Sequence, residues 1–457
     1  MNARADYDSP MNTTRPDAAP VLLVGLGATG ASCARHFARL GHAVRVVDSR
    51  AAPPGLAALG ALREGLDLRL GGFDVAALEG VAAVVVSPGV SLDEPLLAEA
   101  RRRGLELYGD IELFARTAPA PIAAVTGSNG KSTVTTLLAE LAQAGGLAVR
   151  AGGNLGTPAL DLLAGEAPDI YVLELSSFQL DTTTSLRARA ACVLNISPDH
   201  IDRHGSLERY AAAKARILAG AQAVVLNRDD ALVMAMWDRR TPCIRFGLDA
   251  PREGEYGLLE TADGPALARG REALLPAARL KIRGRHNLAN ALAALAMAEA
   301  LGLEPSRLLA ALAAFPGLPH RAEWVAERAG VTFINDSKGT NVGAAVAAIS
   351  GMDGPVVLIA GGDGKGADFA PLAAAAHGKV RAAVLLGRDA ELLAQVLEGT
   401  CPVVRVAGIE DAVVEAARLA VAGDTVLLSP ACASTDMYSD YTERGRRFAA
   451  AARGLPA

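Results

Sequence analysis

The chain has 457 residues, of which 51% are hydrophobic and 21% are charged, a composition typical of well-packed globular domains. At about 150 residues per domain, this length favours three domains. The formal net charge of -5 at pH 7 argues against a general nucleic-acid-binding protein. No apolar run approaches the ~20 residues that a bilayer span needs, so we expect a cytoplasmic protein.

The cysteines and the N-terminal segment also favour a cytoplasmic protein. Five cysteines are scattered along the chain without a CxxC pair, at Cys33, Cys192, Cys243, Cys401 and Cys432. This pattern favours a reducing compartment and argues against a disulfide framework or a zinc site. Residues 1–19 are rich in charged residues and proline, and we interpret them as a disordered tail rather than a signal peptide.

The first predicted domain covers residues 20–118. It begins with "APVLLVGLGATG" and continues with the strand-like runs "HAVRVVDSR" and "VAAVVVSPGV", which are separated by stretches rich in alanine and leucine. Strands that alternate with helices in this way predict a parallel sheet. The segment is therefore expected to be Rossmann-like.

A glycine fingerprint follows the first predicted strand. Gly25, Gly27 and Gly30 are followed by Asp48, 18 residues after the last glycine, at the end of the next strand. In a dinucleotide fold these glycines face a diphosphate and the aspartate binds a ribose. Three interpretations stay open: a nicotinamide-dependent oxidoreductase, a similar domain without a ligand, and a site for another diphosphate such as that of a UDP-sugar.

A second glycine loop opens the predicted central domain, residues 119–318. After a proline-containing linker, "AAVTGSNGKST" gives a strand, a turn from Gly127 to Gly130, and the start of a helix. The usual phosphate loop has four residues between its glycines, whereas this one has two. In such a loop Lys131 reaches the β- and γ-phosphates, and Ser132 or Thr133 holds Mg²⁺. The alternative is a turn with an incidental lysine.

Further apolar runs of the central domain end in polar residues. Glu174 lies in "VLELSSFQL" and His200 in "NISPDHIDRH". Each has an ordinary structural explanation alone, but together beside a phosphate loop they are plausible Mg²⁺ ligands. Residues 249–280 are expected to form an irregular insert with a hairpin. "RGRHNLANALAALAMAEAL" is expected to be helical, with His286 and Asn287 near its start.

The third predicted domain, residues 319–457, follows the linker-like "FPGLPHRAEWV". Its strand-like runs end in "NDSKGTN", "GGDGKG" and "SPACAS". Ligands of open α/β sheets bind beyond the carboxyl ends of the strands. We therefore expect these three loops to line a binding site.

Nine motifs together resemble the Mur ligase family. Those of the central domain are "TGSNGKST", "LELSSFQL", "PDHIDRH", "YAAAKARI" and "RGRHNLANALAA". Those of the last domain are "GLPHRAEWV", "INDSKGTN", "GGDGKGADF" and "SPACASTDMYSDYTERGRRF", which resemble the D-glutamate-adding branch of that family. The resemblance covers nearly the whole chain from residue 20. It implies an α/β protein of three domains: a Rossmann-like N-terminal domain, a central P-loop ATPase-like domain with a mostly parallel sheet, and a Rossmann-like C-terminal domain.

The resemblance also implies a reaction. ATP would phosphorylate the carboxylate of UDP-MurNAc-L-alanine, and the amine of D-glutamate would attack the acyl phosphate, which makes a peptidoglycan precursor. Two Mg²⁺ ions would assist, and Lys214 would react with CO₂ to form a carbamate that helps to bind the second ion. The residues alone favour an ordinary surface lysine at position 214. A monomer is implied.

The residues matched by the resemblance form four groups. Those implied for catalysis are Lys131, Glu174, His200, Lys214 and Arg321, and for metal binding Ser132, Glu174, His200 and Lys214. Those implied for ATP are Gly127, Ser128, Asn129, Gly130, Lys131, Ser132, Thr133, Asn287, Asn290, Arg321 and Asp336. Those implied for UDP-MurNAc-L-alanine are Thr29, Asp48, Ser49, Arg50, Gly89, Asn154, Ser176 and His200. Those implied for D-glutamate are Thr340, Lys365, Ser434, Thr435 and Tyr441, with Lys338 facing the same site.

Some positions differ from the family pattern. Threonine is common where Ser49 stands, leucine where Thr435 stands, and phenylalanine where Tyr441 stands. The last two changes add hydroxyl groups near the expected D-glutamate site. Two neighbouring activities are disfavoured: a diamino-acid-adding sister ligase, whose DNPR-type motif is absent, and folylpolyglutamate synthase, which lacks the N-terminal domain. A sister ligase for another amino acid and a non-catalytic nucleotide-binding protein stay as alternatives.

Overall fold

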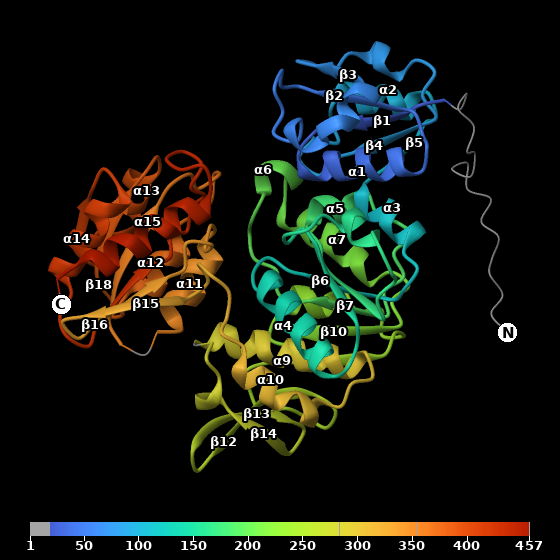
Figure 1. Cartoon of the computed structure of the whole chain (residues 1–457). Helices are drawn as coiled ribbons and strands as arrows, with labels where there is room; N and C mark the ends of the chain where they lie inside the picture. Colours follow the sequence, from blue (N-terminus) through green and yellow to red (C-terminus); the bar gives the residue numbers. More distant parts are fainter. Residues whose placement is uncertain (1–18, 283, 353, 457) are drawn as a thin grey trace. The chain divides into compact units, whose positions relative to one another are not determined.

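The computed structural model describes residues 19–282, 284–352 and 354–456 (Figure 1). Residues 1–18, where the sequence predicts a disordered tail, lie outside this description. Within the described ranges, no helix combines the length and apolar character that crossing a bilayer requires. The chain divides into two compact units. Among the described residues, unit 1 comprises 19–124, Val149–Ala188 and Ala219–Ala221, and unit 2 comprises Val125–Ala148, Arg189–Leu218 and the residues after 221.

Unit 1 contains a parallel five-stranded sheet in the order β3-β2-β1-β4-β5. The strands are β1 (Val21–Val24), β2 (Val44–Asp48), β3 (Asp67–Leu70), β4 (Ala83–Val86) and β5 (Glu106–Tyr108), and the helices are α1 (Ala28–Arg39), α2 (Pro95–Arg102) and α3 (Asp110–Thr117). Alternate strand residues face α2 in one apolar cluster, and α1 lies on the other side of the sheet (Figure 1). The strand order reverses between β1 and β4, which is where such sheets bind ligands.

Unit 1 also contains β7 (Val149–Gly153), β8 (Ile170–Glu174) and α5 (Ser177–Asp181). β7 and β8 pair in parallel, and every residue of β8 is buried. A strand buried on both faces is expected to read as a continuous apolar run, as "IYVL" does. Glu174 interrupts that run at the carboxyl end of the strand.

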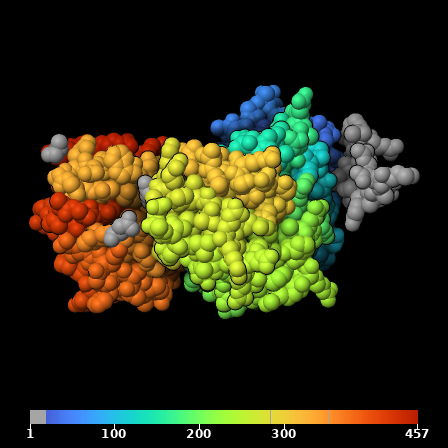
Figure 2. All heavy atoms as spheres, turned by 90° about the horizontal axis from the view of Figure 1, so that it is seen from below, coloured from blue at the N-terminus to red at the C-terminus, as the bar shows by residue number. Residues whose placement is uncertain are grey.

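The first part of unit 2 has the strand order β14-β13-β12-β11-β10-β9-β6. Its strands are β6 (Ile122–Thr126, shared with unit 1), β9 (Ala190–Val193), β10 (Ala223–Asn227), β11 (Cys243–Phe246), β12 (Tyr256–Thr261), β13 (Gly264–Arg269) and β14 (Glu272–Pro276). Its helices are α4 (Lys131–Ala144), α6 (Ile201–His204), α7 (Leu207–Ala215), α8 (Ala231–Ala235), α9 (Arg285–Ala300) and α10 (Leu309–Ala314). β12, β13 and β14 are antiparallel, which confirms the hairpin insert, and they lie in the yellow-green region of Figure 2.

The second part of unit 2 is a sheet in the order β15-β16-β20-β17-β18-β19, in which only the β15–β16 pair is antiparallel. The strands are β15 (Glu323–Arg328), β16 (Val331–Asn335), β17 (Val356–Gly361), β18 (Val380–Leu386), β19 (Val403–Arg405) and β20 (Thr425–Leu428). The helices are α11 (Val342–Ser350), α12 (Ala370–Ala376), α13 (Ala390–Leu397), α14 (Ile409–Leu419) and α15 (Tyr441–Gly454). One apolar cluster joins the sheet to α14 and α15, and another joins it to α11, α12 and α13. The predicted α/β class is confirmed.

Candidate active site

The first glycine loop joins β1 to α1 in unit 1. Gly25 has a φ of +96°, and a Cβ there would lie 2.8 Å from Val90 Cγ2. A Cβ on Gly30 would lie 2.1 Å from the carbonyl oxygen of Gly25. Gly27, in contrast, has open space where its Cβ would be. Two glycines therefore permit close packing of the chain, and the third leaves the start of α1 accessible to a ligand.

An acidic side chain closes the same loop. Asp48, at the end of β2, accepts a hydrogen bond from the backbone N–H of Leu26 at 2.7 Å. It also accepts from the Arg50 guanidinium at 2.8 Å, and this interaction is the main reason that the pKa of Asp48 is lowered to about 2. Asp48 is thus a carboxylate at neutral pH, aligned by the loop. Thr29 lies in the first turn of α1, and Ser49 and Gly89 are exposed after β2 and β4.

Three further predicted residues lie at the carboxyl ends of the neighbouring strands β7 and β8 in unit 1. Glu174 is 3% exposed and accepts a hydrogen bond from Asn154 Nδ2 at 2.6 Å. Ser176 caps α5 through a capping box with Gln179. The Gln179 side-chain amide also donates to Asp110 at 3.0 Å. Gln179 was not predicted from the sequence, although its place three residues after Ser176 is a recognisable capping signal.

The second glycine loop joins β6 to α4 in unit 2, as predicted for a phosphate loop. Gly127 and Gly130 have φ values of +154° and +84°. A Cβ at Gly130 would lie 2.4 Å from Asn290 Oδ1, a contact that only glycine avoids. The helix then begins at Lys131, so its first backbone N–H groups have no partner within the helix. Such a helix start binds anions.

Two lysines meet at one carbonyl group of this loop. Lys131 Nζ and Lys214 Nζ each lie 2.9 Å from the carbonyl oxygen of Gly127. Lys214 is 1% exposed, and its ammonium lies 4.6 Å from the centre of the Tyr210 ring. The interpretation of Lys214 as a surface lysine is therefore wrong, because α7 presents it to the interior beside the loop.

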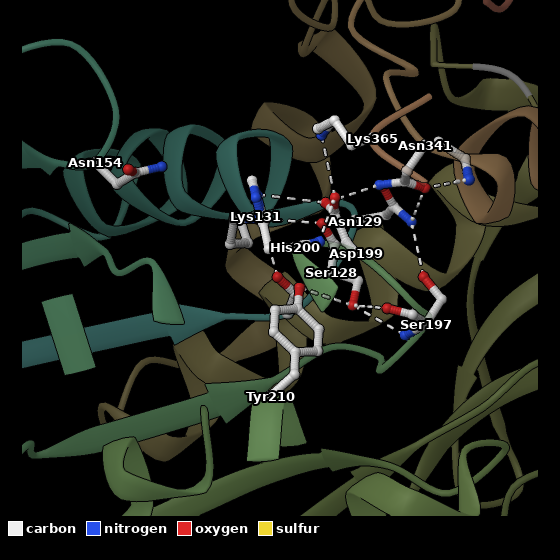
Figure 3. A network of polar contacts seen from close by, with 12 residues as sticks. Ser128, Asn129, Lys131, Asn154, Ser197, Asp199, His200, Tyr210, Asn341 and Lys365 are labelled. Atoms are coloured by element: carbon white, nitrogen blue, oxygen red, sulfur yellow. Dashed lines mark hydrogen bonds and ion pairs between the residues drawn. The ribbon is translucent and has the colours of Figure 1, made fainter. Parts of the chain in front are cut away.

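A polar network at the phosphate loop connects the first part of unit 2 with the second part (Figure 3). Asn129 and Asn341 exchange amide hydrogen bonds at 3.2 and 3.3 Å. Asn341 Nδ2 also donates to Asp199 Oδ2 at 3.2 Å, and Lys365 Nζ donates to Asp199 Oδ1 at 3.3 Å. Asp199 and Asn341 were not assigned from the sequence, although both lie in motifs that were singled out. Their role depends on which loops meet in space.

His200 follows Asp199 in the loop after β9. Its φ of +54° is unusual for a residue other than glycine, and such strain is often found at functional sites. Burial is the largest cause that lowers the pKa of His200, and Asp199, 3.7 Å from its Nε2 atom, opposes that shift. The imidazole is therefore neutral at pH 7, the form that binds metals.

A cavity of about 280 Å³ lies beside the phosphate loop. Asn287 and Asn290, on the first turns of α9, line it and are joined by a 3.1 Å hydrogen bond. Arg321 lines it as well and donates from Nη2 to Ser132 Oγ at 2.7 Å. Asp336 also lines the cavity, and burial raises the pKa of its carboxyl group to about 6. The cavity thus combines amide groups, a guanidinium and a carboxyl group.

The residues predicted for D-glutamate lie on three loops after β16, β17 and β20. Ser434 is buried, Thr435 is exposed, and Thr340 and Lys365 are half-buried. Tyr441 begins α15, and the Lys338 ammonium lies 3.9 Å from the centre of its ring. The three strands are parallel neighbours in the sheet, so these loops all begin on the same side, at the carboxyl ends of the strands.

Comparisons with known families cover most of the chain. Residues 19–109 match the N-terminal domain of MurD-like Mur ligases, residues 125–298 the Mur ligase middle domain, and residues 320–432 the Mur ligase glutamate ligase domain. The order of these matches agrees with the order of the glycine loop, the phosphate loop and the three C-terminal loops.

Individual proteins agree with these matches. A UDP-N-acetylmuramoylalanine–D-glutamate ligase from Nitrosococcus oceani is 56% identical over 96% of this chain and 97% of its own. The enzyme of that name from Pseudomonas aeruginosa is 52% identical over 95% and 98%. A UDP-N-acetylmuramate–alanine ligase from Thermotoga maritima has the same fold, with a TM-score of 0.58 at 20% identity over 94% of this chain and 98% of that one. The chain belongs to the Mur ligase family.

Proposed function

We propose that this chain is an ATP-dependent ligase that joins D-glutamate to UDP-N-acetylmuramoyl-L-alanine in the synthesis of a peptidoglycan precursor. Relatives named for this reaction are 48–56% identical over nearly the full length. The structural observation that carries the proposal is the convergence of Lys131 and Lys214 on the Gly127 carbonyl group. An amide ligase that uses ATP needs a cation at this place, which Lys131 supplies, and groups that hold Mg²⁺, to which Lys214 would add a carbamate anion.

The chemistry explains the need for cations. A carboxylate is a poor acyl donor, because oxide is a very poor leaving group. Transfer of the γ-phosphoryl group to the substrate carboxylate makes an acyl phosphate, whose leaving group is phosphate. Two anions must approach each other for that step, so positive charge has to offset their repulsion. Lys131 at the phosphate loop and Arg321, which contacts Ser132, are the residues that we assign to this role.

The donor set of the chain fits Mg²⁺. We assign Ser132, Glu174 and His200 as ligands, because hydroxyl, carboxylate and neutral imidazole groups can all coordinate divalent cations. Lys214 would contribute after its amine reacts with CO₂ and loses a proton, which converts the side chain to a carbamate anion. When bound, Mg²⁺ supplies charge stabilisation to the transferring phosphoryl group. Burial of Lys214 beside the loop supports this assignment.

The substrate sites follow from the two glycine loops and the C-terminal loops. We assign the uridine diphosphate to the crevice with Thr29, Asp48, Ser49, Arg50 and Gly89, since Gly27 leaves the start of α1 open. Asn154 and Ser176 are assigned to the same substrate. Asn287 and Asn290 would bind adenine, and Asp336 the ribose.

D-glutamate has two carboxylates that must be held while its amine stays free to attack. We assign Lys365, Thr340, Ser434, Thr435 and Tyr441 to these carboxylates, with Lys338 beside them. The amine would then lose its proton as the tetrahedral intermediate collapses and phosphate leaves. Use of ATP favours action in the cytoplasm, and we propose that the enzyme works as a monomer.

A phosphate-release assay tests the proposal directly. The purified chain receives ATP, Mg²⁺ and UDP-N-acetylmuramoyl-L-alanine, with a panel of D- and L-amino acids supplied one at a time. We expect release only with D-glutamate, together with a product whose mass increases by one glutamyl group. Release with another amino acid would identify a sister ligase instead. Saturable binding of NADH without any ligase activity would favour an oxidoreductase.

A further inference from the structure

Arg444 is a buried cation that the reaction as described above does not use. It lies in the first turn of α15 and is 1% exposed. Its Nε atom donates to Ser337 Oγ at 3.0 Å, and Nη2 donates to the Ser337 carbonyl oxygen at 2.9 Å. Nη1 donates to the carbonyl oxygens of Gly361 and Cys432 at 3.3 Å, and Nη2 donates a second bond to Cys432. These contacts use the five N–H groups of a guanidinium.

The three acceptor residues come from the three loops that carry the assigned D-glutamate residues. Ser337 directly precedes Lys338 in the loop after β16, and Gly361 ends β17, directly before the loop that contains Lys365. Cys432 lies two residues before Ser434 in the loop after β20. One side chain therefore fixes the spacing of all three loops.

The same contacts reach the start of α15. The Ser337 hydroxyl, which accepts from Arg444, donates to the carbonyl oxygen of Tyr441 at 2.8 Å. The ring of Tyr441 lies against the Lys338 ammonium. A change at position 444 would thus be transmitted to an aromatic ring and an ammonium group of the assigned site through a single hydroxyl.

The charge of Arg444 is not paired within these contacts, because all of its acceptors are neutral oxygens. Desolvation lowers the pKa of Arg444 to about 10, so it still carries its positive charge at pH 7. A buried cation is costly unless another interaction compensates for it. Asp436 and Asp336 already interact with this charge without a direct hydrogen bond, and a dicarboxylate held by the neighbouring loops would add to that compensation.

We propose that Arg444 is a positioning residue for the amino-acid substrate, one that sets the spacing of the three loops and adds positive potential to the site for a dicarboxylate. The proposal rests on the assignment of D-glutamate to those loops. It predicts that Arg444 affects binding of the amino acid more than binding of ATP, whose ribose is assigned to Asp336 next to Ser337, and has little influence on the UDP-sugar site.

Two variants and a control test this role. Arg444→Lys keeps the charge but loses the planar set of five donors, and Arg444→Met keeps much of the length without charge. Arg447→Met is the matched control, since Arg447 lies on the same helix but is exposed and pairs with Glu410 at the surface. KM for each substrate is measured on the full chain, with far-ultraviolet circular dichroism to check folding.

We expect both Arg444 variants to raise KM for D-glutamate by about 10- to 100-fold, with Met worse than Lys, because charged hydrogen bonds are lost. KM for the UDP-sugar should change by less than about twofold, as in the Arg447→Met control, and KM for ATP should rise less than KM for D-glutamate. Positional isotope exchange in γ-phosphoryl-labelled ATP, measured without D-glutamate, should persist because acyl phosphate formation does not need the amino acid.

Equal increases in all three KM values, or an unchanged KM for D-glutamate in a folded Arg444→Lys variant, would overturn the proposal. Absence of D-glutamate-dependent activity in the unaltered chain would instead refute the proposed function.

Discussion

The two glycine loops of this chain have similar backbones and different charged neighbours. Each follows a parallel strand, each contains at least one glycine at positive φ, and each opens a helix. Beside the first loop, Asp48 pairs with Arg50. Beside the second, two ammonium groups share the carbonyl oxygen of Gly127. The glycines indicate that phosphate can bind, whereas the neighbouring charges distinguish a loop that holds a diphosphate from one that promotes phosphoryl transfer.

Removal of the phosphate-loop lysine should have the largest effect. We expect Lys131→Ala to lower kcat by about 10³-fold or more, because the charge that offsets repulsion between two anions is lost. Phosphate release with all three substrates measures the effect, and Lys281→Ala, which changes an exposed lysine, is the control. Near-normal turnover of Lys131→Ala would show that the second loop does not use this lysine to promote phosphoryl transfer.

The second lysine gives a sharper test of the same loop. Lys214→Ala should lose about 10²-fold or more in kcat and recover part of it with added acetate or formate, which replace the carbamate anion near the metal. The same additives should not restore Lys131→Ala, whose missing group is a cation. Full activity of Lys214→Ala without any additive would show that the carbamate is not needed.

Matched glycine substitutions compare the backbones of the two loops. Gly130→Ala places a Cβ 2.4 Å from Asn290 Oδ1 at a φ of +84°, and we expect it to lower the free energy of unfolding by about 1–3 kcal/mol. Gly27→Ala meets open space, so stability should be retained while KM for the UDP-sugar rises. Thermal unfolding and substrate kinetics separate the two effects. An equally stable Gly130→Ala variant would show that the second loop tolerates a side chain.

The two acids assigned to ribose binding, Asp336 and Asp48, should make the KM values of ATP and of the UDP-sugar depend differently on pH. Burial raises the pKa of Asp336 to about 6, whereas Arg50 is the main cause that lowers the pKa of Asp48 to about 2. Only a carboxylate accepts hydrogen bonds from both ribose hydroxyls, so KM for ATP should fall as the pH rises from 5 to 7. KM for the UDP-sugar should not follow that trend, because Asp48 is already ionised.

The two pKa shifts also predict opposite effects of pH on the free energy of unfolding. Asp336 binds protons more tightly in the folded state than in the unfolded state, so its contribution to stability declines as the pH rises from about 4 to about 6. The contribution of Asp48 is present above about pH 4 and is lost as the pH falls through about 2. Asp336→Asn should abolish the change in KM for ATP. A change that persists in this variant would assign it to another group.

Sequence patterns predicted the glycine loops, the hairpin insert and the α/β class because each depends on local chain chemistry. Short strands such as β3 and β5 were not predicted, since three or four partly exposed residues carry little periodic signal. Asp199, Asn341 and Arg444 escaped assignment for a different reason. Their partners lie on loops far away in the sequence, and only the three-dimensional fold brings those loops together.

A crystal structure of the chain with UDP-N-acetylmuramoyl-L-alanine, Mg²⁺ and a non-hydrolysable ATP analogue tests the central difference between the loops most directly. We predict the triphosphate at Gly127–Thr133 and the uridine diphosphate at the loop that contains Gly27, beside Asp48. A triphosphate bound at the first loop, or a sugar nucleotide bound away from it, would contradict this account.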